Sequence, residues 1–247
     1  MPDSRSNEES VLRDSVMVVI PALDEELTIG PVVDSLIEQG FSCIRVVDNG
    51  SRDKTGEVAR KAGAVVMTET VSGYGRACWR ACEKLPETIE WILFCDGDGS
   101  DRLDELDSFL DVARRADFVL GNRRHSKEVR TSMTLVQNFG NGLATFLMQV
   151  GWSYRYGDLG PLRLIRRHLF EEIQMEDRGF GWTIEMQVRA VELKARIVEL
   201  PVGYRVRQGG RSKISGTIRG SVQAGSIILS TLAKFWIRKM KRKFRGI

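Results

Sequence analysis

Short apolar runs and amphipathic segments alternate along the first half of the chain. The apolar runs have the length of β-strands and lie at residues 16–20, 43–47, 64–67, 91–95 and 118–120. Between the first four runs, apolar residues recur three or four positions apart, which is typical of helices that bury one face. This regular alternation predicts an α/β fold, in which helices cover both faces of a mostly parallel sheet.

Longer helices are expected in the second half of the chain. Residues 131–150 predict a helix whose apolar side chains pack in the core: Leu135, Phe139, Leu143, Phe146, Leu147 and Val150. Another helix is expected after Trp182. One long amphipathic helix is expected from residue 217 to about residue 243. We expect this last helix to follow the sheet as a separate C-terminal element.

Polar sequences follow three of the predicted strands, at residues 21–26, 48–51 and 96–101. In parallel sheets, ligands bind at the carboxyl ends of the strands. Since parallel strands end at the same edge of a sheet, we expect these three segments to lie together. Their combination of acidic residues and glycines favours a nucleotide and metal site.

The third of these segments is the acidic turn Asp96-Gly97-Asp98-Gly99-Ser100-Asp101, which directly follows a buried strand. Buried carboxylates cost several kcal/mol each unless something neutralises them. Carboxylate oxygens bind Mg²⁺ and Mn²⁺, and Mg²⁺ usually shares its coordination with substrate phosphates. A solvated turn in which Asp101 caps the next helix is the simpler alternative for the turn taken alone.

Charge is distributed unevenly along the 247 residues. The net charge is +4, but residues 234–247 contain seven Lys or Arg and no acid, which leaves −3 on the first 233 residues. The basicity is thus a tail feature, and no nucleic-acid partner is expected. Four cysteines and two histidines give little support for a zinc site. Residues 1–15 lack the apolar core of a signal peptide and predict a disordered leader.

The motifs together resemble the family-2 glycosyltransferases, which have the GT-A fold. The likeness is strongest to the branch that contains the dolichol- and polyprenyl-phosphate mannose and glucose synthases. It covers about residues 16–220 and is carried by VIPALDEE at 19–26, VDNGS at 47–51, GYGRA at 73–77, DGDGS at 96–100, GDLGPLR at 157–163, GWTIE at 181–185, ELPV at 199–202 and RSK at 211–213. The expected organisation is a leader at 1–15, a GT-A catalytic domain at 16–216 and a basic amphipathic helix at 217–247.

The resemblance implies a nucleotide-sugar site, with Mg²⁺ or Mn²⁺ held against the diphosphate by Asp96 and Asp98. The implied contacts of the UDP- or GDP-sugar are Pro21, Leu23, Glu25, Asp48, Asn49, Gly75, Arg76, Asp96, Gly97 and Asp98. Leu23 and Asn49 depart from the residues that many relatives have, Tyr and Asp. Glu25 also suits a first-turn acid beside the helix dipole, and Asp48 an Asx turn.

The resemblance also implies catalytic residues, namely Asp98, Asp158 and Glu185. Glu185 corresponds to a catalytic acid in inverting relatives, although a glutamate on the helix surface fits the pattern too. Arg163 fits a structural role. Candidates for the phosphates of donor and acceptor are Arg123, Arg124, Arg207, Arg211 and Lys213, because guanidinium groups match phosphate geometry. A solvated basic loop is the alternative for each group of cations.

The predicted C-terminal helix combines an apolar stripe with a basic surround. The stripe comprises Val222, Ile228, Leu229, Leu232, Trp236, Met240 and Phe244. Such a helix suits an anionic membrane interface, and a helix docked on the domain is an equal alternative. The longest late uncharged stretch, residues 220–233, is too short to span a bilayer. We expect a cytoplasmic protein in peripheral contact with the inner face of the cell membrane, and self-association is compatible with the sequence.

The predicted function is inverting transfer of a sugar from a UDP- or GDP-sugar to a polyprenyl (dolichyl-type) phosphate, assisted by a divalent metal. Transfer to a soluble hydroxyl acceptor is an alternative, and it would require a true general base. Nucleotidyl transfer is a further alternative, but it usually uses a glycine-rich basic loop after the first strand, which is absent here. A non-catalytic nucleotide-binding protein would not need both Asp96 and Asp98.

Overall fold

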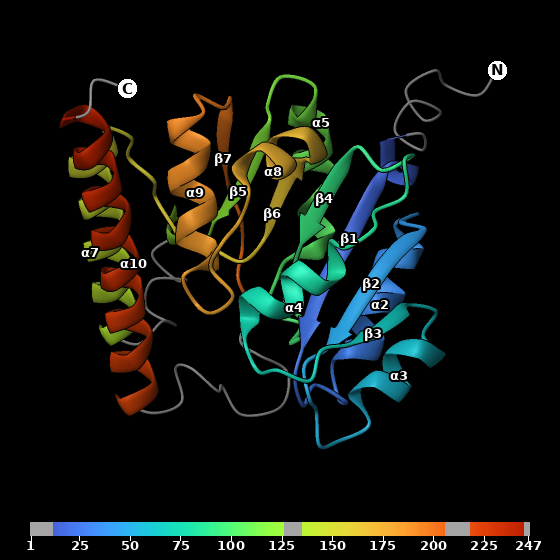
Figure 1. The fold of residues 1–247 in the computed structure, drawn as a ribbon. Coiled ribbons are helices and arrows are strands. Elements are labelled where there is room, and N and C mark those ends of the chain that lie inside the picture. Colours follow the sequence, from blue (N-terminus) through green and yellow to red (C-terminus); the bar gives the residue numbers. More distant parts are fainter. Residues whose placement is uncertain (1–11, 126–134, 206–217, 245–247) are drawn as a thin grey trace.

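The computed structural model describes residues 12–125, 135–205 and 218–244. Its centre is a seven-stranded sheet in the order β3-β2-β1-β4-β6-β5-β7 (Figure 1). Strand β6 runs antiparallel to both of its neighbours, and the other pairs are parallel. The strands are β1 (Val16–Ala22), β2 (Cys43–Asp48), β3 (Val65–Thr68), β4 (Trp91–Phe94), β5 (Phe118–Asn122), β6 (Arg163–Arg166) and β7 (Ile197–Pro201). The predicted mostly parallel α/β fold is confirmed.

Helices pack on both faces of the sheet. They are α2 (Ile29–Glu38), α3 (Thr55–Lys61), α4 (Tyr74–Ala81), α5 (Leu106–Ala113), α7 (Leu135–Trp152), α8 (Arg167–Ile173), α9 (Trp182–Glu192) and α10 (Ile218–Phe244), with 3₁₀ turns at Leu103–Glu105 and Arg123–His125. Strand β1 is apolar at successive positions because Val18 and Ile20 enter one core cluster, whereas Met17 and Val19 enter the other.

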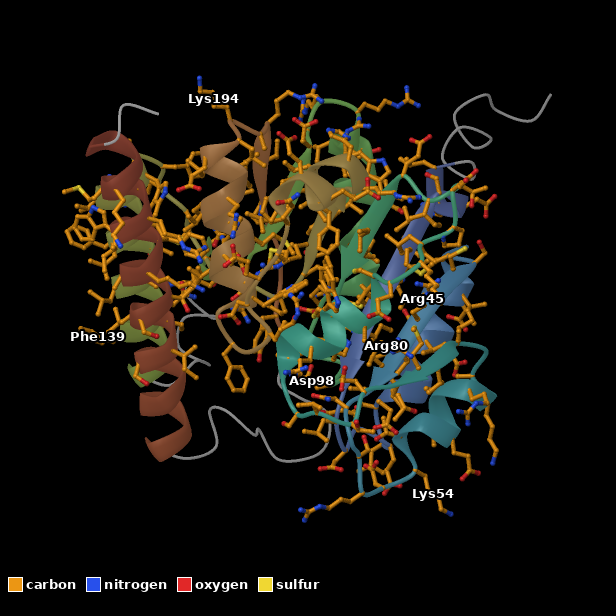
Figure 2. All side chains as sticks on the ribbon, in the orientation of Figure 1. Arg45, Lys54, Arg80, Asp98, Phe139 and Lys194 are labelled. Atoms are coloured by element: carbon orange, nitrogen blue, oxygen red, sulfur yellow. The ribbon has the colours of Figure 1, made fainter. Side chains whose placement is uncertain are left out.

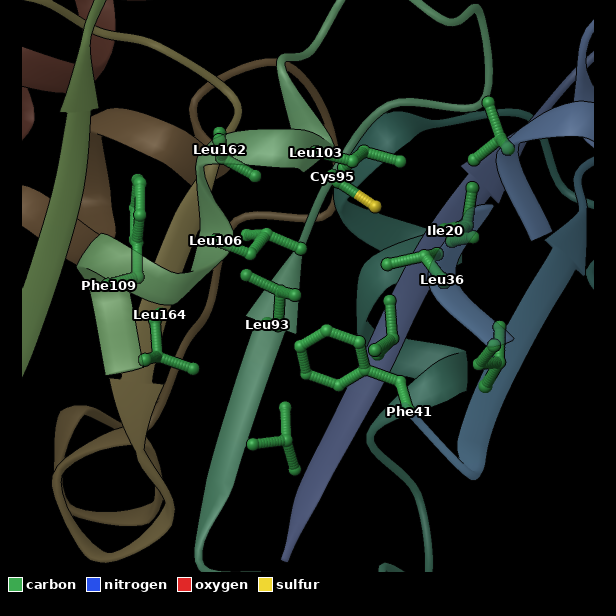
Figure 3. Close-up of a cluster of buried hydrophobic side chains, with 14 of the residues drawn as sticks. Ile20, Leu36, Phe41, Leu93, Cys95, Leu103, Leu106, Phe109, Leu162 and Leu164 are labelled. Atoms are coloured by element: carbon green, nitrogen blue, oxygen red, sulfur yellow. The ribbon is translucent and has the colours of Figure 1, made fainter. Parts of the chain in front are cut away.

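The two clusters divide the helices between the faces of the sheet. Leu36 of α2 and Phe109 of α5 pack against Ile20 and Leu93 in the first cluster (Figure 3). The second cluster joins α4, α7, α8, α9 and α10 on the opposite face. Helices α7 and α10 lie side by side at the end of the molecule farthest from β3 (Figure 1).

The first contacts of the catalytic domain begin before residue 16. Leu12 packs against the first core cluster. Arg13 forms an ion pair with Asp107 on α5, at 2.5 Å between Nη2 and Oδ1. The predicted leader at 1–15 is therefore wrong for residues 12–15, and residues 1–11 lie outside the described part of the chain.

Helix α7 buries only part of the stripe that its sequence predicts. Leu147 packs against the second core cluster and Leu143 is half-buried, whereas the side chain of Leu135 lies outside the described part of the chain. Phe139, Phe146 and Val150, expected in the core, are exposed. The side that packs inward carries Ala144 and Met148, together with Asn141, Thr145 and Trp152. Apolar residues lie on both sides of this helix, so the periodicity alone does not identify the buried side, and the predicted stripe combines residues of both. Within the described residues, no helix is long and apolar enough to cross a membrane.

Candidate active site

The polar strand ends meet at one edge of the sheet, as expected. Strand β1 lies between β2 and β4, and Ala22 pairs with Asp48 in register. The backbone N–H of Asn49 donates to the carbonyl of Ala22 at 2.9 Å. On the other side of β1, the N–H of Cys95 donates to the carbonyl of Val19 at 3.2 Å. Figure 2 shows Asp98 near this edge, below α4.

The acidic turn after β4 is held by its own backbone. The N–H of Asp96 donates to Oδ2 of Asp101 at 2.9 Å, and the N–H of Ser100 donates to Oδ1 of Asp98 at 2.9 Å. Thr28 anchors the turn to the start of α2 by donating its hydroxyl to the carbonyl of Gly97 at 2.8 Å. Asp98 and Asp101 are both buried, so the solvated turn considered from the sequence is wrong.

Negative charge accumulates in this turn. Burial raises the pKa of Asp101 to about 6, and the nearby carboxylate of Asp98 adds to the rise, while the N–H of Asp96 and the charge of Arg123 oppose it. Clustered carboxylate oxygens are the ligands that Mg²⁺ and Mn²⁺ prefer. No group of three or more His, Cys, Asp or Glu suited to a metal occurs in the described residues. A divalent ion held by Asp96 and Asp98 would take its remaining ligands from a bound diphosphate.

The loop after β1 is fastened to the loop after β2 and to the first residue of α3. The N–H of Glu25 donates to the hydroxyl of Thr55 at 2.7 Å, and the N–H of Asp24 donates to the hydroxyl of Ser51 at 3.0 Å. Asp48 accepts the N–H of Ser51 at 2.8 Å, which is the Asx-type turn considered from the sequence. Glu25 is buried in this arrangement. Pro21 near the end of β1 and Leu23 in the loop are both half-buried.

Asn49 supports a loop rather than offering donors to a base. Its side-chain amide donates to the carbonyls of Glu69 at 3.0 Å and Val71 at 2.9 Å. Its Oδ1 accepts the N–H of Gly73 at 2.8 Å. Both amide hydrogens are thus used within the protein. Asn49 fixes the chain that leads into α4. A contact between Asn49 and the nucleotide stays a prediction, and the side chain could make it only through Oδ1, as an acceptor.

The first turn of α4 contacts the loop of residues 174–181. The N–H of Gly75 donates to the carbonyl of Gly179 at 3.1 Å, and that of Arg76 to the carbonyl of Arg178 at 2.9 Å. A Cβ added to Gly75 would lie 2.8 Å from the carbonyl carbon of Arg178, so only glycine allows this approach. The backbone N–H groups of Gly75 and Arg76 are therefore used in bonds to the loop. The contacts predicted between these two residues and the nucleotide-sugar must come from other atoms.

Glu185 holds the same loop from its other side. The carboxylate is fully buried, so the glutamate on the helix surface considered from the sequence is wrong. It accepts the N–H groups of Glu176 at 3.0 Å and Asp177 at 2.6 Å, and pairs with Nε of Arg189 at 3.0 Å. The loop residues that it fixes are adjacent to those that contact α4. Glu185 is therefore placed to position the loop.

Asp158 and Arg123 form a buried ion pair beside the acidic turn. Asp158 accepts the backbone N–H of Arg123 at 3.0 Å and two guanidinium bonds at 2.8 and 3.1 Å, and it also accepts from Asn141 of α7 at 2.5 Å. Burial alone would raise the pKa of Asp158, but the charge and hydrogen bonds of Arg123 outweigh it and lower the pKa below its ordinary value. The guanidinium of Arg123 also lies 5.4 Å from the ring centre of Tyr204.

The other predicted cations are placed differently. Arg124 is directed toward α7: its Nη2 would lie 3.8 Å from a Cβ added to Gly142, and Nη1 donates to the carbonyl of Gly157 at 3.5 Å. Arg163 is fully buried and donates to backbone carbonyls, including that of Thr183 at 3.3 Å, which supports its structural role. Arg207, Arg211 and Lys213 lie outside the described residues. Asn141 and Tyr204 belong to none of the motifs found in the sequence, so the contact of Asn141 with Asp158 and that of Tyr204 with Arg123 were not predicted.

Comparisons with known proteins extend this description. Residues 17–174 match the Glycosyl transferase family 2. An uncharacterized glycosyltransferase of Mycobacterium tuberculosis is 34% identical over 212 residues, which cover 85% of this chain and 94% of the relative. An undecaprenyl-phosphate mannosyltransferase of Micrococcus luteus is 31% identical, covering 83% and 89%. A dolichyl-phosphate hexose transferase of Haloferax volcanii is 30% identical, covering 87% and 93%.

Solved structures share the fold at lower identity. Mannosyl-3-phosphoglycerate synthase from Rubrobacter xylanophilus aligns with a TM-score of 0.75 at 20% identity, covering 98% of this chain and 80% of that one. Glucosyl-3-phosphoglycerate synthase from M. tuberculosis, solved with Mn²⁺, UDP-glucose and phosphoglyceric acid, aligns with a TM-score of 0.71 at 20% identity, covering 96% and 85%. These matches confirm the GT-A type of fold predicted from the sequence.

Proposed function

Because the chain belongs to the Glycosyl transferase family 2, we propose that it transfers a hexose from a UDP- or GDP-sugar to a polyprenyl phosphate, with inversion at the anomeric carbon. Two relatives support the acceptor, since one is an undecaprenyl-phosphate mannosyltransferase and the other a dolichyl-phosphate hexose transferase. A polyprenyl phosphate resides in a membrane, so the enzyme would work at a membrane surface, on its cytoplasmic side.

The observation that carries the proposal is the buried acidic turn at the end of β4, one strand away from the turn at Asp48. Asp96 and Asp98 would hold Mg²⁺ or Mn²⁺ there. A bound divalent ion neutralises the charge that develops on the departing nucleoside diphosphate. The loop after β1 and the residues around Asp48 would hold the base and ribose of the donor.

Arg123 would receive the acceptor phosphate. A guanidinium group suits phosphate oxygens, and the bonds to Asp158 fix its position before any ligand arrives. An acceptor phosphate is already anionic near neutral pH, so the reaction needs no strong general base. This agrees with the way in which Asp158 and Glu185 are bonded, because both carboxylates hold other groups in place.

A soluble phosphorylated acceptor is the second candidate. The solved relatives with this fold include synthases of glucosyl- and mannosyl-3-phosphoglycerate. Arg123 could bind the phosphate of such a molecule equally well, but the attacking hydroxyl would then require a base. The two candidates share the phosphate and differ in the nucleophile.

Product analysis separates these functions. The protein with Mn²⁺ is incubated with a panel of UDP- and GDP-sugars and either a short-chain polyprenyl phosphate or 3-phosphoglycerate. We expect a lipid-linked sugar phosphate and release of the nucleoside diphosphate. A glycosylated phosphoglycerate as the only product would establish the second candidate. Release of inorganic pyrophosphate in a parallel incubation with UTP or GTP and a sugar 1-phosphate would indicate nucleotidyl transfer. Absence of transfer to either acceptor, from every donor, would contradict the proposal.

A further inference from the structure

Helices α7 and α10 form a layer whose inner side packs on the domain. Leu232 and Phe235 of α10 are buried in the second core cluster, together with Ala144 and Met148 of α7. The ammonium group of Lys239 on α10 donates to the carbonyl of Gly151 on α7 at 2.6 Å. The sequence allowed either a helix docked on the domain or a helix at a membrane interface. One side of α10 is docked on the domain, and its opposite side is exposed.

The outer sides of the two helices expose large apolar side chains at matching intervals. On each helix, three such residues are seven and then four positions apart, which places them along one stripe. Figure 2 shows Phe139 on the side of the helix pair that is away from the sheet. Exposed fractions range from 40% at Leu229 to 72% at Phe139. We define the α7–α10 face as Phe139, Phe146 and Val150 with Leu229, Trp236 and Met240.

The charge of these helices is of one sign. Helix α10 contains seven Lys or Arg and no acid, and α7 contains no charged residue. Lys234 and Arg238 turn toward Glu176 of the domain, at 3.6 and 2.9 Å. Lys241 is exposed beside Met240. If two copies of the face met, they would bring like charges together, whereas an anionic lipid surface offers both an apolar layer and opposite charge.

We propose that the α7–α10 face docks on the surface of an anionic membrane. The proposal rests on the lipid acceptor of the proposed function. It adds α7, which the sequence predicted to pack in the core, to the membrane contact predicted for the C-terminal helix. The inner side of α7 carries Asn141, which bonds Asp158, which in turn holds Arg123. One helix, about 10 Å across, thus separates the predicted phosphate site from the docked surface. An acceptor lipid can reach Arg123 while its chain stays in the bilayer.

Vesicle sedimentation tests the face without any substrate. The full chain is mixed with vesicles of phosphatidylcholine alone or with about 30% phosphatidylglycerol, lacking polyprenyl phosphate and nucleotide-sugar. We expect binding to the anionic vesicles, weakened by about tenfold at high salt. The double variant Phe146→Ser with Trp236→Ser should lose a further factor of about ten or more in partitioning. Val65→Ser, at a 62% exposed apolar position on β3, is the matched control and should bind as the wild type does.

Failure of the wild type to bind anionic vesicles would overturn the proposal, and so would either of two further outcomes, provided that circular dichroism shows the variants to be folded. One is unchanged vesicle binding by the double variant. The other is a wild-type dimer that the double variant converts to a monomer, which would make the face a self-association surface. Transfer to a water-soluble short-chain polyprenyl phosphate, measured in parallel, separates the two proposals. If the wild type does not bind anionic vesicles but transfers sugar to the soluble polyprenyl phosphate, only the docking face is refuted. If it binds the vesicles but transfers no sugar, only the proposed lipid acceptor is refuted.

Discussion

Asp158 accepts three hydrogen bonds from Arg123, one from the backbone N–H of Arg123 and two from its guanidinium group. Both groups are largely removed from solvent, and Asn141 adds a further bond to the same carboxylate. This relationship fixes the orientation of the guanidinium without any ligand. Asp158, which was predicted to be catalytic, thus holds Arg123, which was predicted to bind the acceptor phosphate. The two predicted site residues form one ion pair.

Replacing Asp158 by Asn should disturb Arg123 more than it disturbs chemistry. Loss of one partner leaves a buried charge unpaired, and we expect the free energy of unfolding to fall by about 3 kcal/mol or more. The KM for the acceptor phosphate should rise, and the pH dependence of kcat should stay as in the wild type. Urea unfolding and initial rates measure both effects, with Arg115→Lys as an exposed control. An unchanged KM with a shifted pH profile would instead identify Asp158 as a proton acceptor.

Glu185→Gln tests whether the buried glutamate positions the loop or transfers a proton. Gln can accept from only one oxygen and carries no charge, so the bonds to Glu176, Asp177 and Arg189 weaken. We expect the free energy of unfolding to fall by about 2 kcal/mol and donor affinity to weaken, with transfer still measurable. Nearly complete loss of turnover in a variant of normal stability would favour a true base and a hydroxyl acceptor.

Gly75→Ala should separate α4 from the loop of residues 174–181. The new Cβ would lie 2.8 Å from backbone at Arg178, and relief of this contact requires movement of the chain. We expect a loss of about 2 kcal/mol in the free energy of unfolding, together with weaker donor binding. Gly140→Ala on α7 is the matched control, because its Cβ meets nothing within 4 Å and should stabilise the helix by about 1 kcal/mol. Equal effects of the two variants would contradict the role of the close approach.

Asp117 should contribute stability that is lost in acid. Hydrogen bonds from the side chain of Arg196 lower the pKa of Asp117 from 3.8 to about 2. Between these values the unfolded chain binds more protons than the folded one, so stability falls as the pH drops through this range. With Arg196 largely exposed, we expect about 1 kcal/mol at neutral pH. Urea midpoints of wild type and Asp117→Asn should differ at pH 7 and converge near pH 2, and a constant difference would contradict this account.

The sequence predicted those parts of the site that depend on strand order. Asp48 and the acidic turn meet because parallel strands end at one edge, and local apolar runs identify such strands. The pairing of Asp158 with Arg123 joins residues 35 positions apart, and no local pattern encodes it. The burial of Glu185 was missed because α9 is enclosed on most sides: Ile184, Met186, Gln187 and Val188 around it are buried as well.

Helix α7 shows why periodicity is insufficient when two sides of a helix are apolar. Met148 and Trp152 supply the inner side, and Phe139 and Phe146 the outer side, so the hydrophobic pattern fits either orientation. Only the tertiary partners decide between them. The sequence of α10 has the same ambiguity, because the predicted stripe mixes buried Leu232 with exposed Trp236. The exposed sides of both helices carry the proposed membrane contact.

Titration calorimetry of the donor with the wild type and Asp98→Asn tests the central claim that the acidic turn holds a metal against the diphosphate. UDP- and GDP-sugars are titrated with Mn²⁺ and with EDTA, and Asp104→Asn serves as a control at an exposed carboxylate nearby. We predict that Mn²⁺ strengthens donor binding by about tenfold or more in the wild type and in Asp104→Asn, and has no effect in Asp98→Asn. Equal metal dependence in Asp98→Asn, or full donor affinity of the wild type in EDTA, would contradict the account.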